Sequence, residues 1–304
     1  MKGVDDLAGG CGRVVEAPRR RVGTPVARSE GRLARGTGRI SLVVGCALVC
    51  AAAALCLVSL VWTPYDPTLM DVANRFAPPS PEHLLGTDQF GRDILSRLMA
   101  ASQPAFGVGL GSVLLGAAVG AAAGLVAGLG GSALRALIMR VVDGLMAFPG
   151  ILLAMVLVLV LGRGIASVLV AIAVFMVPTF ARVACQTTLE LRGSLFIKAA
   201  RSCGCSKAQV ALRHVLPNIA APLITQLTAC VGTAMLLEAS LSFLGLGVQP
   251  PAASWGSMLN EALPYVFGHP SLAVAPGIVL MLVVLGFNLL GDGLNDRLVQ
   301  GRSS

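Results

Sequence analysis

The stretch IKAARSCGCSKAQVALRHVLPN, residues 197–218, is basic, has helical character and lies between two long apolar runs. Ser194 can cap the start of a short helix, and Gly204 suits the left-handed conformation that ends one. Spacing by helical turns predicts that small and apolar side chains share one face of this helix. The members of that face are Leu195, Phe196, Ala199, Ala200 and Cys203.

A second helix is predicted directly after Gly204. Ser206 and Gln209 have the spacing of a capping box, and Leu216-Pro217 marks the turn into the next apolar run. The segment is therefore predicted to be a helix–glycine–helix unit, called here the elbow (residues 193–217). Its small Ala199 and Ala200 allow another protein surface to come close. A loop that only connects two membrane helices needs no such construction, whereas a loop that docks into a partner does.

The rest of the chain has the composition of a membrane protein. Of its 304 residues 55% are hydrophobic and only 12% are charged, about half the charged share of soluble domains. A lipid core about 30 Å thick needs roughly 20 apolar residues per helix, and six runs approach that length. They are Ser41–Trp62, Pro104–Leu129, Leu145–Gly162, Ile165–Ala181, Ile219–Gly247 and Leu272–Leu290. We expect an all-α polytopic membrane protein with about six transmembrane helices.

The distribution of lysine and arginine predicts the orientation. If the N-terminus lies inside, 19 of the 23 basic residues fall in inner segments, as the positive-inside rule requires. The N-terminus, the C-terminus and the elbow are then cytoplasmic. The net charge of +8 follows from this rule, and we expect no nucleic-acid partner because no folded basic domain is present.

Three regions are predicted along the chain. Residues 1–39 form a basic, disordered cytoplasmic tail, residues 40–103 hold the first transmembrane helix and an outer loop, and residues 104–304 form the core with the elbow. The second span carries Gly116, Gly120, Gly124 and Gly128, one per helical turn. Such a face lets another helix approach closely, so this helix is expected to be buried against protein, with a second subunit as a candidate partner, and not to be surrounded by lipid.

Few residues offer chemistry. Glu238 is the one acid well inside a span, which makes it a candidate functional residue; a structural hydrogen bond near the Gly245 and Gly247 turn is the favoured alternative. No phosphate-binding P-loop is present. The Cys203-Gly-Cys205 pair lacks further ligands at metal spacing. We expect no catalytic residue, no bound metal or cofactor and no enzyme activity, so any energy input must come from a partner.

The elbow resembles the EAA loop of permease subunits of bacterial ABC importers. Ala199-Ala200, Gly204 and Leu216-Pro217 stand at the family's spacing, while Lys198 replaces the family's glutamate and His214 a hydrophobic residue. Further stretches are similar to the dipeptide, oligopeptide and nickel branch, and closest to its C-type subunit. They are GTDQFGRDILSRL (86–98), MRVVDGLMAFPG (139–150), LEASLSFLGLGVQPP (237–251), SWGSML (254–259) and FNLLGDGLNDRL (287–298). ASQPAF at 101–106 departs from the family pattern.

The resemblance implies a type I importer permease in the bacterial inner membrane. It implies a homologous second permease, two ATPase subunits that bind ATP and magnesium, an extracytoplasmic substrate-binding lipoprotein and surrounding lipid as partners. The elbow would be the coupling helix on the ATPases. The residues that would carry this role are Lys198, Ala199, Ala200, Arg201, Gly204, Leu216 and Pro217.

The substrate remains open at this stage. Dipeptides or oligopeptides come first, with glutathione or nickel and cobalt chelates as alternatives, and a self-sufficient secondary transporter is the competing reading. With lysine at position 198, we predict compensating acids in the ATPase cleft; the alternative is an exposed, tolerant position.

Overall fold

The computed structural model describes residues 26–202 and 204–302. The chain divides into two units, Met1–Thr37 and Gly38–Ser304, and the second holds the membrane helices and the elbow. Helices dominate the described residues, and no β-strand occurs among them. The α-helices are α1 (Val26–Ser59), α2 (Ile94–Leu129), α3 (Ser132–Met146), α4 (Gly150–Leu161), α5 (Ile165–Arg192), α6 (Leu195–Ser202), α7 (Lys207–Gln209), α8 (Leu216–Phe243), α9 (Trp255–Ala262) and α10 (Ser271–Arg302). Short turns of helix occupy Val72–Asn74, Val210–Val215 and Leu263–Tyr265.

Five of these helical stretches are long and apolar enough to cross a membrane, and the pair α3 and α4 makes a sixth if it forms one broken span. The predicted third span, Leu145–Gly162, is therefore wrong as one continuous helix. Its apolar run lies mostly in α4, and α3 and α4 meet at a bend of 92°. Pro149 explains the break, because a proline disfavours helical backbone in the residue before it and α4 begins only after it.

Several predicted boundaries shift outward, whereas the first and fifth spans end earlier than predicted, at Ser59 and Phe243. The helix α2 begins at Ile94, well before the expected start at Pro104, because Asp93 caps it: an Oδ of Asp93 accepts a hydrogen bond from the Ser96 N–H at 2.8 Å. The helix α5 continues past Ala181 to Arg192. The helix α1 begins at Val26, and residues 1–25 of the expected tail lie outside the described residues.

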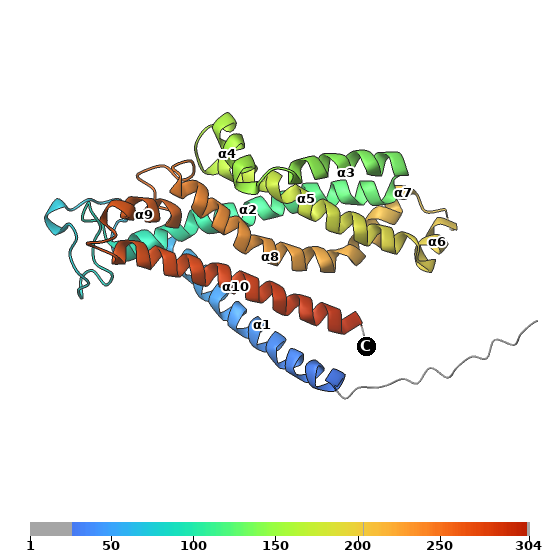
Figure 1. Cartoon of the computed structure of the whole chain (residues 1–304), viewed down its shortest axis with the longest axis horizontal. Helices are drawn as coiled ribbons and strands as arrows, with labels where there is room; N and C mark the ends of the chain where they lie inside the picture. Colours follow the sequence, from blue (N-terminus) through green and yellow to red (C-terminus); the bar gives the residue numbers. More distant parts are fainter. Residues whose placement is uncertain (1–25, 203, 303–304) are drawn as a thin grey trace, which may run out of the picture. The chain divides into compact units, whose positions relative to one another are not determined.

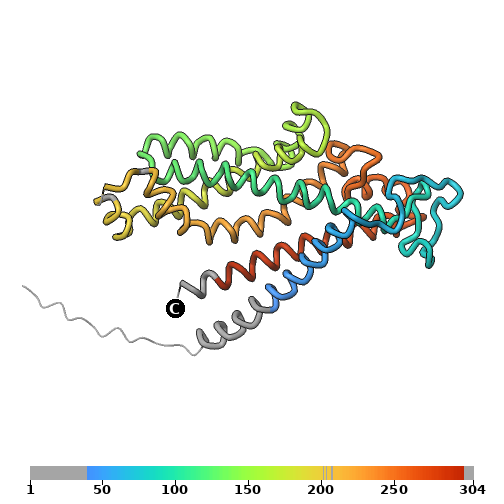
Figure 2. The backbone as a smooth tube through the Cα atoms, turned by 180° about the vertical axis from the view of Figure 1, so that it is seen from behind, coloured from blue at the N-terminus to red at the C-terminus, as the bar shows by residue number. Residues whose placement is uncertain are grey.

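The glycine face of α2 packs within the chain. In Figures 1 and 2, α2 and α5 lie side by side. A Cβ built on Gly116 would lie 2.7 Å from the Ala173 carbonyl, and one on Gly124 would lie 2.3 Å from the Ala181 carbonyl. Gly120 and Gly128 meet α5 in the same way. The face is therefore buried against protein as predicted, and in the described structure the partner is α5 of the same chain and not a second subunit.

The two ends of the Gly38–Ser304 unit differ in character. At one end, called the loop end, lie the 60–93 segment, α9 and the starts of α2 and α10; at the other, called the elbow end, lie α6 and α7 (Figure 1). Most buried polar side chains of the described residues belong to the loop end, in the ranges 87–102 and 238–254. The elbow end carries its own small apolar cluster instead.

Candidate functional site: the elbow and the loop end

The buried side chain of Ile197 links the helix α6 to the rest of the elbow. Ile197 is fully buried and lies in an apolar cluster separate from the main core. The other buried members of that cluster are Ala184, Val210, Val215 and Ile219. These residues come from α5, the turn before α8 and α8 itself, so Ile197 joins α6 to both helices that flank the elbow.

The predicted small and apolar face of α6 points outward. Leu195 is 84% exposed and Phe196 is 44% exposed, Ala199 is exposed and Ala200 is half-buried. Lys198 is exposed beside them. The face predicted from spacing is therefore an open surface, and Ile197, which the spacing argument left out, makes the inward contact. The side chains of Arg201 and Cys203 lie outside the described residues.

The hinge of the elbow has the predicted local structure. Gly204 has φ of +83°, the left-handed conformation that suits a glycine after a helix, and the Cys205 N–H donates to the Ala200 carbonyl at 3.1 Å. The capping box is present in both directions. The Gln209 N–H donates to the Ser206 hydroxyl at 3.2 Å, and the Ser206 N–H donates to the Gln209 side-chain oxygen at 2.9 Å.

The expected turn at Leu216-Pro217 is wrong, because the helix continues through it. The stretch Val210–Phe243 forms one span, in which a turn of π-helix at Val210–Val215 leads directly into α8. The Leu216 N–H bonds to the Ala211 carbonyl, five residues back. A proline has no N–H to donate and is tolerated in the first turn of a helix, so Pro217 can stand where the wide turn ends.

Of the predicted coupling residues with described side chains, the elbow brings together an exposed set. Lys198 and Ala199 lie on α6, Gly204 is in the hinge, and Leu216 and Pro217 are exposed at the start of α8. Because all of these project from the same end of the unit, they can meet one partner surface.

Glu238 lies at the far end of α8, close to the loop end. It is almost fully buried. Its Oε1 accepts a hydrogen bond from the Ser242 hydroxyl at 2.7 Å, and the Ser242 oxygen accepts one from the Val248 N–H at 3.2 Å. The carboxyl group is thereby linked to the turn after α8, where Gly245 has φ of +75°.

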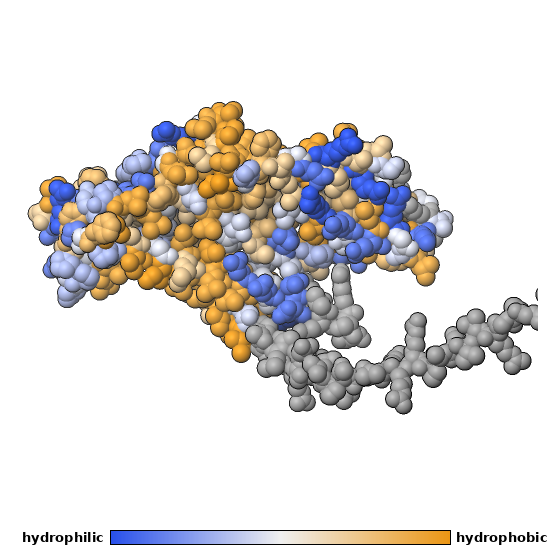
Figure 3. Space-filling model, in the orientation of Figure 1, coloured by the Kyte–Doolittle hydropathy of each residue, from blue (hydrophilic) through white to orange (hydrophobic). Residues whose placement is uncertain are grey.

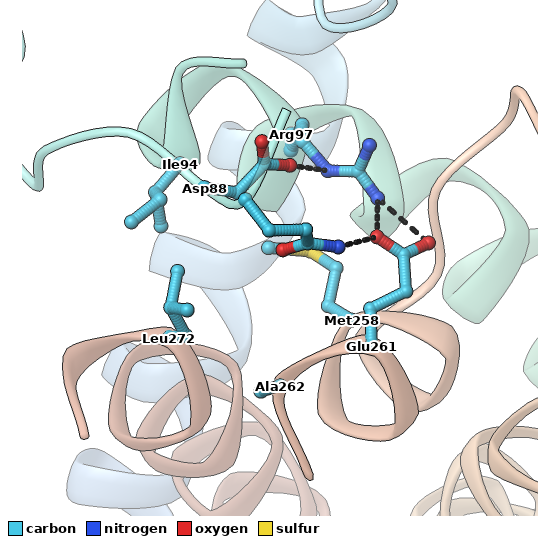
Figure 4. A pocket seen from close by; sticks show the side chains of 8 residues that line it. Asp88, Ile94, Arg97, Met258, Glu261, Ala262 and Leu272 are labelled. Atoms are coloured by element: carbon cyan, nitrogen blue, oxygen red, sulfur yellow. Dashed lines mark hydrogen bonds and ion pairs between the residues drawn. The ribbon is translucent and has the colours of Figure 1, made fainter. Parts of the chain in front are cut away.

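A buried charge cluster at the loop end was missed by reasoning from the sequence. Glu261 of α9 accepts hydrogen bonds from Gln89 at 3.2 Å, Arg92 at 2.6 Å and Arg97 at 3.0 Å, and Arg92 also donates to Asp88 at 2.6 Å. Figure 4 shows Arg97 between Asp88 and Glu261. The alternating charges of the DQFGRD stretch are a signal for such a cluster, but Glu261 stands more than 160 residues away along the chain.

The cluster joins two distant parts of the chain. Asp88 and Arg92 belong to the segment that leads into α2, Arg97 lies in the first turn of α2, and Glu261 comes from α9. The Trp255 indole N–H of α9 also donates to the Leu98 carbonyl of α2 at 3.1 Å. Charge pairing and this hydrogen bond together fix α9 on the first turns of α2.

Comparison with known proteins identifies the family. Residues 120–304 match the family model described as binding-protein-dependent transport system inner membrane component. The chain is 48% identical over 236 residues to the glutathione transport system permease proteins GsiD of Escherichia coli O6:K15:H31 (strain 536) and of Shigella boydii serotype 4 (strain Sb227). Each match covers 77% of this chain and 78% of the relative. The chain therefore belongs to the binding-protein-dependent inner membrane permeases of ABC importers, which confirms the resemblance carried by the elbow.

Proposed function

We propose that this permease forms half of a translocation path for short peptides, glutathione among them, and that its elbow couples the path to a partner ATPase. The observation that carries the proposal is the open face of α6. Leu195 and Phe196 are apolar yet exposed, and an exposed apolar patch next to small residues is typical of a protein-binding surface. Ile197 holds this surface on the membrane helices from behind.

The helix after the hinge offers a direct mechanical route. From Lys207 the chain is helical through the π-turn to Phe243, a length of about 55 Å at 1.5 Å per residue. One end of this continuous helix lies in the elbow, and the other end carries Glu238 and the turn that leads to α9. A displacement of α6 by an ATPase would therefore move α8, and with it the loop end.

The partners follow from the family and from the elbow. We propose a second permease as the other half of the path, two ATPases that supply ATP and magnesium, and an extracytoplasmic binding protein that delivers substrate. The cytoplasmic position of the elbow and of both termini remains a prediction from the lysine and arginine distribution.

The substrate class rests on the relatives and on chemistry. Relatives at 48% identity are named glutathione transport permeases. Glutathione is a tripeptide, so one path for short peptides accommodates both dipeptides and glutathione as substrates. Nickel or cobalt chelates are the second candidate.

Lys198 gives the elbow an unusual charge for its family. Its side chain is exposed, so we propose that acids in the partner ATPase cleft face it. The expected signature is that Lys198→Glu weakens ATPase coupling whereas Lys198→Arg preserves it. Coupling that is unchanged or improved in Lys198→Glu would show that the lysine is not required.

Reconstituted uptake tests the proposal. The chain, its co-purified permease and the ATPases are placed in proteoliposomes with the binding protein, and uptake of radiolabelled glutathione and of a dipeptide is measured with and without ATP. We expect uptake only when ATP and the ATPases are both present. Uptake by the chain alone would favour a self-sufficient secondary transporter, and uptake of a nickel chelate in place of peptides would favour the second candidate.

A further inference from the structure

The helix α3 exposes two faces of opposite character. At 100° per residue, Leu134, Leu137 and Val141 lie on one face, and Arg140 and Asp143 lie on another about 120° away. All five residues are exposed. Figure 3 shows hydrophilic side chains gathered over α3 and the part of α5 beside it. One environment cannot suit both faces.

The charged face continues onto α5. Arg182 pairs with Asp143 at 2.6 Å, yet their side chains remain 44% and 59% exposed. Toward the C-terminal end of α5, Gln186 and Glu190 follow Arg182 at intervals of one helical turn, and both are exposed. We call the set Arg140, Asp143, Arg182, Gln186 and Glu190 the polar face.

The bend between α3 and α4 determines where this face opens. Phe175 lies on the same side of α5 as Arg182 and Gln186, within about 40° on a helical projection. There α4 covers α5: a Cβ on Gly150 would lie 2.3 Å from the Phe175 ring. Beyond the bend α4 no longer provides that cover, and the side chains on this side of α5 are open.

The depth of Arg182 argues against lipid as its surroundings. From Ile165 at the start of α5 the helix rises about 26 Å to Arg182, so Arg182 lies near the opposite edge of a hydrocarbon core about 30 Å thick. Charged side chains at this edge are costly against lipid tails, so they pair with each other and turn toward water, headgroups or protein. The apolar face of α3 has no such restriction.

We propose that the polar face lines a water-filled stretch of the translocation path and that the Asp143–Arg182 pair contacts the substrate there. The inference rests on the proposed function and adds the substrate chemistry. A peptide with free ends carries a carboxylate, which Arg182 can bind, and an ammonium group, which Asp143 can bind. With Arg140 beside them, two positive charges face one negative charge at this level, which favours zwitterionic and anionic peptides over cationic ones.

Thiol labelling tests where the face points, independently of transport. In a chain with its native cysteines replaced by serine or alanine, Asp143→Cys and Val141→Cys form a matched pair, since Val141 is 60% exposed and the Asp143 side chain 59%. The assembled transporter in inverted membrane vesicles without ATP is treated with a charged, membrane-impermeant maleimide. We expect labelling at position 143 to be at least about tenfold faster than at 141, because lipid excludes the reagent. Equal rates, or faster labelling at 141, would overturn the proposal.

Asp143→Cys breaks the ion pair with Arg182 and could disturb folding, so a second pair of cysteine variants serves as a control. Gln186→Cys and Leu137→Cys remove no charge, and we expect the same order of labelling, with position 186 faster. An exposed ion pair contributes little stability, so membrane levels of all four variants should match the parent chain. Slow labelling at 143 and 186 in well-expressed variants would mean a dry interface and would contradict the water-filled path.

Selective uptake tests the substrate contact. We expect Arg182→Gln to reduce uptake of glutathione by about tenfold, as the loss of a charged hydrogen bond predicts, while Asp143→Asn lowers uptake of a zwitterionic dipeptide more than uptake of its N-acetylated form. Unchanged preferences in both variants would overturn the substrate contact. If the parent complex moves no peptide at all, the proposed function fails, whereas the labelling result still decides where the polar face points.

Discussion

Ile197 of α6 and Ile219 of α8 are both fully buried and belong to the same apolar cluster at the elbow end. The exposed surface of α6 is thus held on the flanking helices through a shared apolar cluster. Because the contact is made by few side chains, the elbow depends strongly on each of them.

Ile197→Ala should loosen α6 from the helices that flank the elbow. Removing a fully buried isoleucine side chain typically costs about 2–5 kcal/mol, here concentrated on the elbow. We expect ATPase activity of the complex to lose most of its stimulation by the binding protein. The matched control is Leu195→Ala, whose side chain is exposed: thermal stability should be unchanged, while the affinity for the ATPase falls. A stability loss in the control and none in Ile197→Ala would reverse the assignment of inner and outer faces.

Gly124→Ala should separate α2 from α5. The added Cβ would lie 2.3 Å from the Ala181 carbonyl and 2.7 Å from the Ala184 Cβ, so the helices must shift at an expected cost of about 1–3 kcal/mol. Gly107→Ala in the same helix is the control, since a Cβ there meets nothing within 4 Å. Thermal unfolding of the purified protein in detergent compares the two. Equal melting temperatures would contradict the close α2–α5 contact.

Glu238 can be tested by exchanging its chemistry without its shape. A glutamine at this position can still accept a hydrogen bond from the Ser242 hydroxyl, whereas an alanine cannot. The alanine variant would therefore leave Ser242, and the hydrogen bond that Ser242 accepts from Val248, less firmly positioned. If the role of Glu238 is structural, Glu238→Gln should retain most ATP-dependent uptake and Glu238→Ala should lose it. Loss of uptake in both variants, with normal assembly and stability, would point to a proton-carrying carboxyl group.

Glu261→Gln should weaken the loop end. Arg97 is 1% exposed and Arg92 is 3% exposed, and removing the acid partner of buried charges typically costs about 3–5 kcal/mol. The exposed Glu82→Gln provides a control with the same change of charge. We expect a lower melting temperature and faster proteolysis in the 60–93 segment for Glu261→Gln alone. The same melting temperature as in the control would show that the cluster does not hold α9 in place.

Local signals in the elbow were strong enough to predict its hinge. Gly204 and the Ser206–Gln209 capping box depend only on neighbouring residues, and both are present. The inward side of α6 was not predictable, since the spacing argument favoured the larger apolar set and Ile197 lies outside it. Which side of a short helix is buried depends on the helices that flank it, and those contacts are distant in sequence.

Longer-range features explain the other differences. Hydropathy alone predicts the third span as one helix, because it does not register the break that Pro149 introduces between α3 and α4. Predicting the Glu261 cluster requires knowing that α9 packs against the start of α2. The glycine face of α2 was predictable as a packing surface, but its partner was not, because close approach suits a helix of any chain.

The most direct test of the account is whether a partner ATPase binds the open face of α6. Tagged chains carrying Ala199→Trp or Ala199→Ser are expressed with their native partners, extracted from membranes in mild detergent and purified, and the ATPase retained per permease is quantified by mass spectrometry. Ala199 is exposed, so neither change should affect folding. We predict that the serine variant retains the ATPase and a second permease, and that the tryptophan variant retains the second permease but loses most of the ATPase. Equal ATPase retention in both variants would contradict docking through this surface.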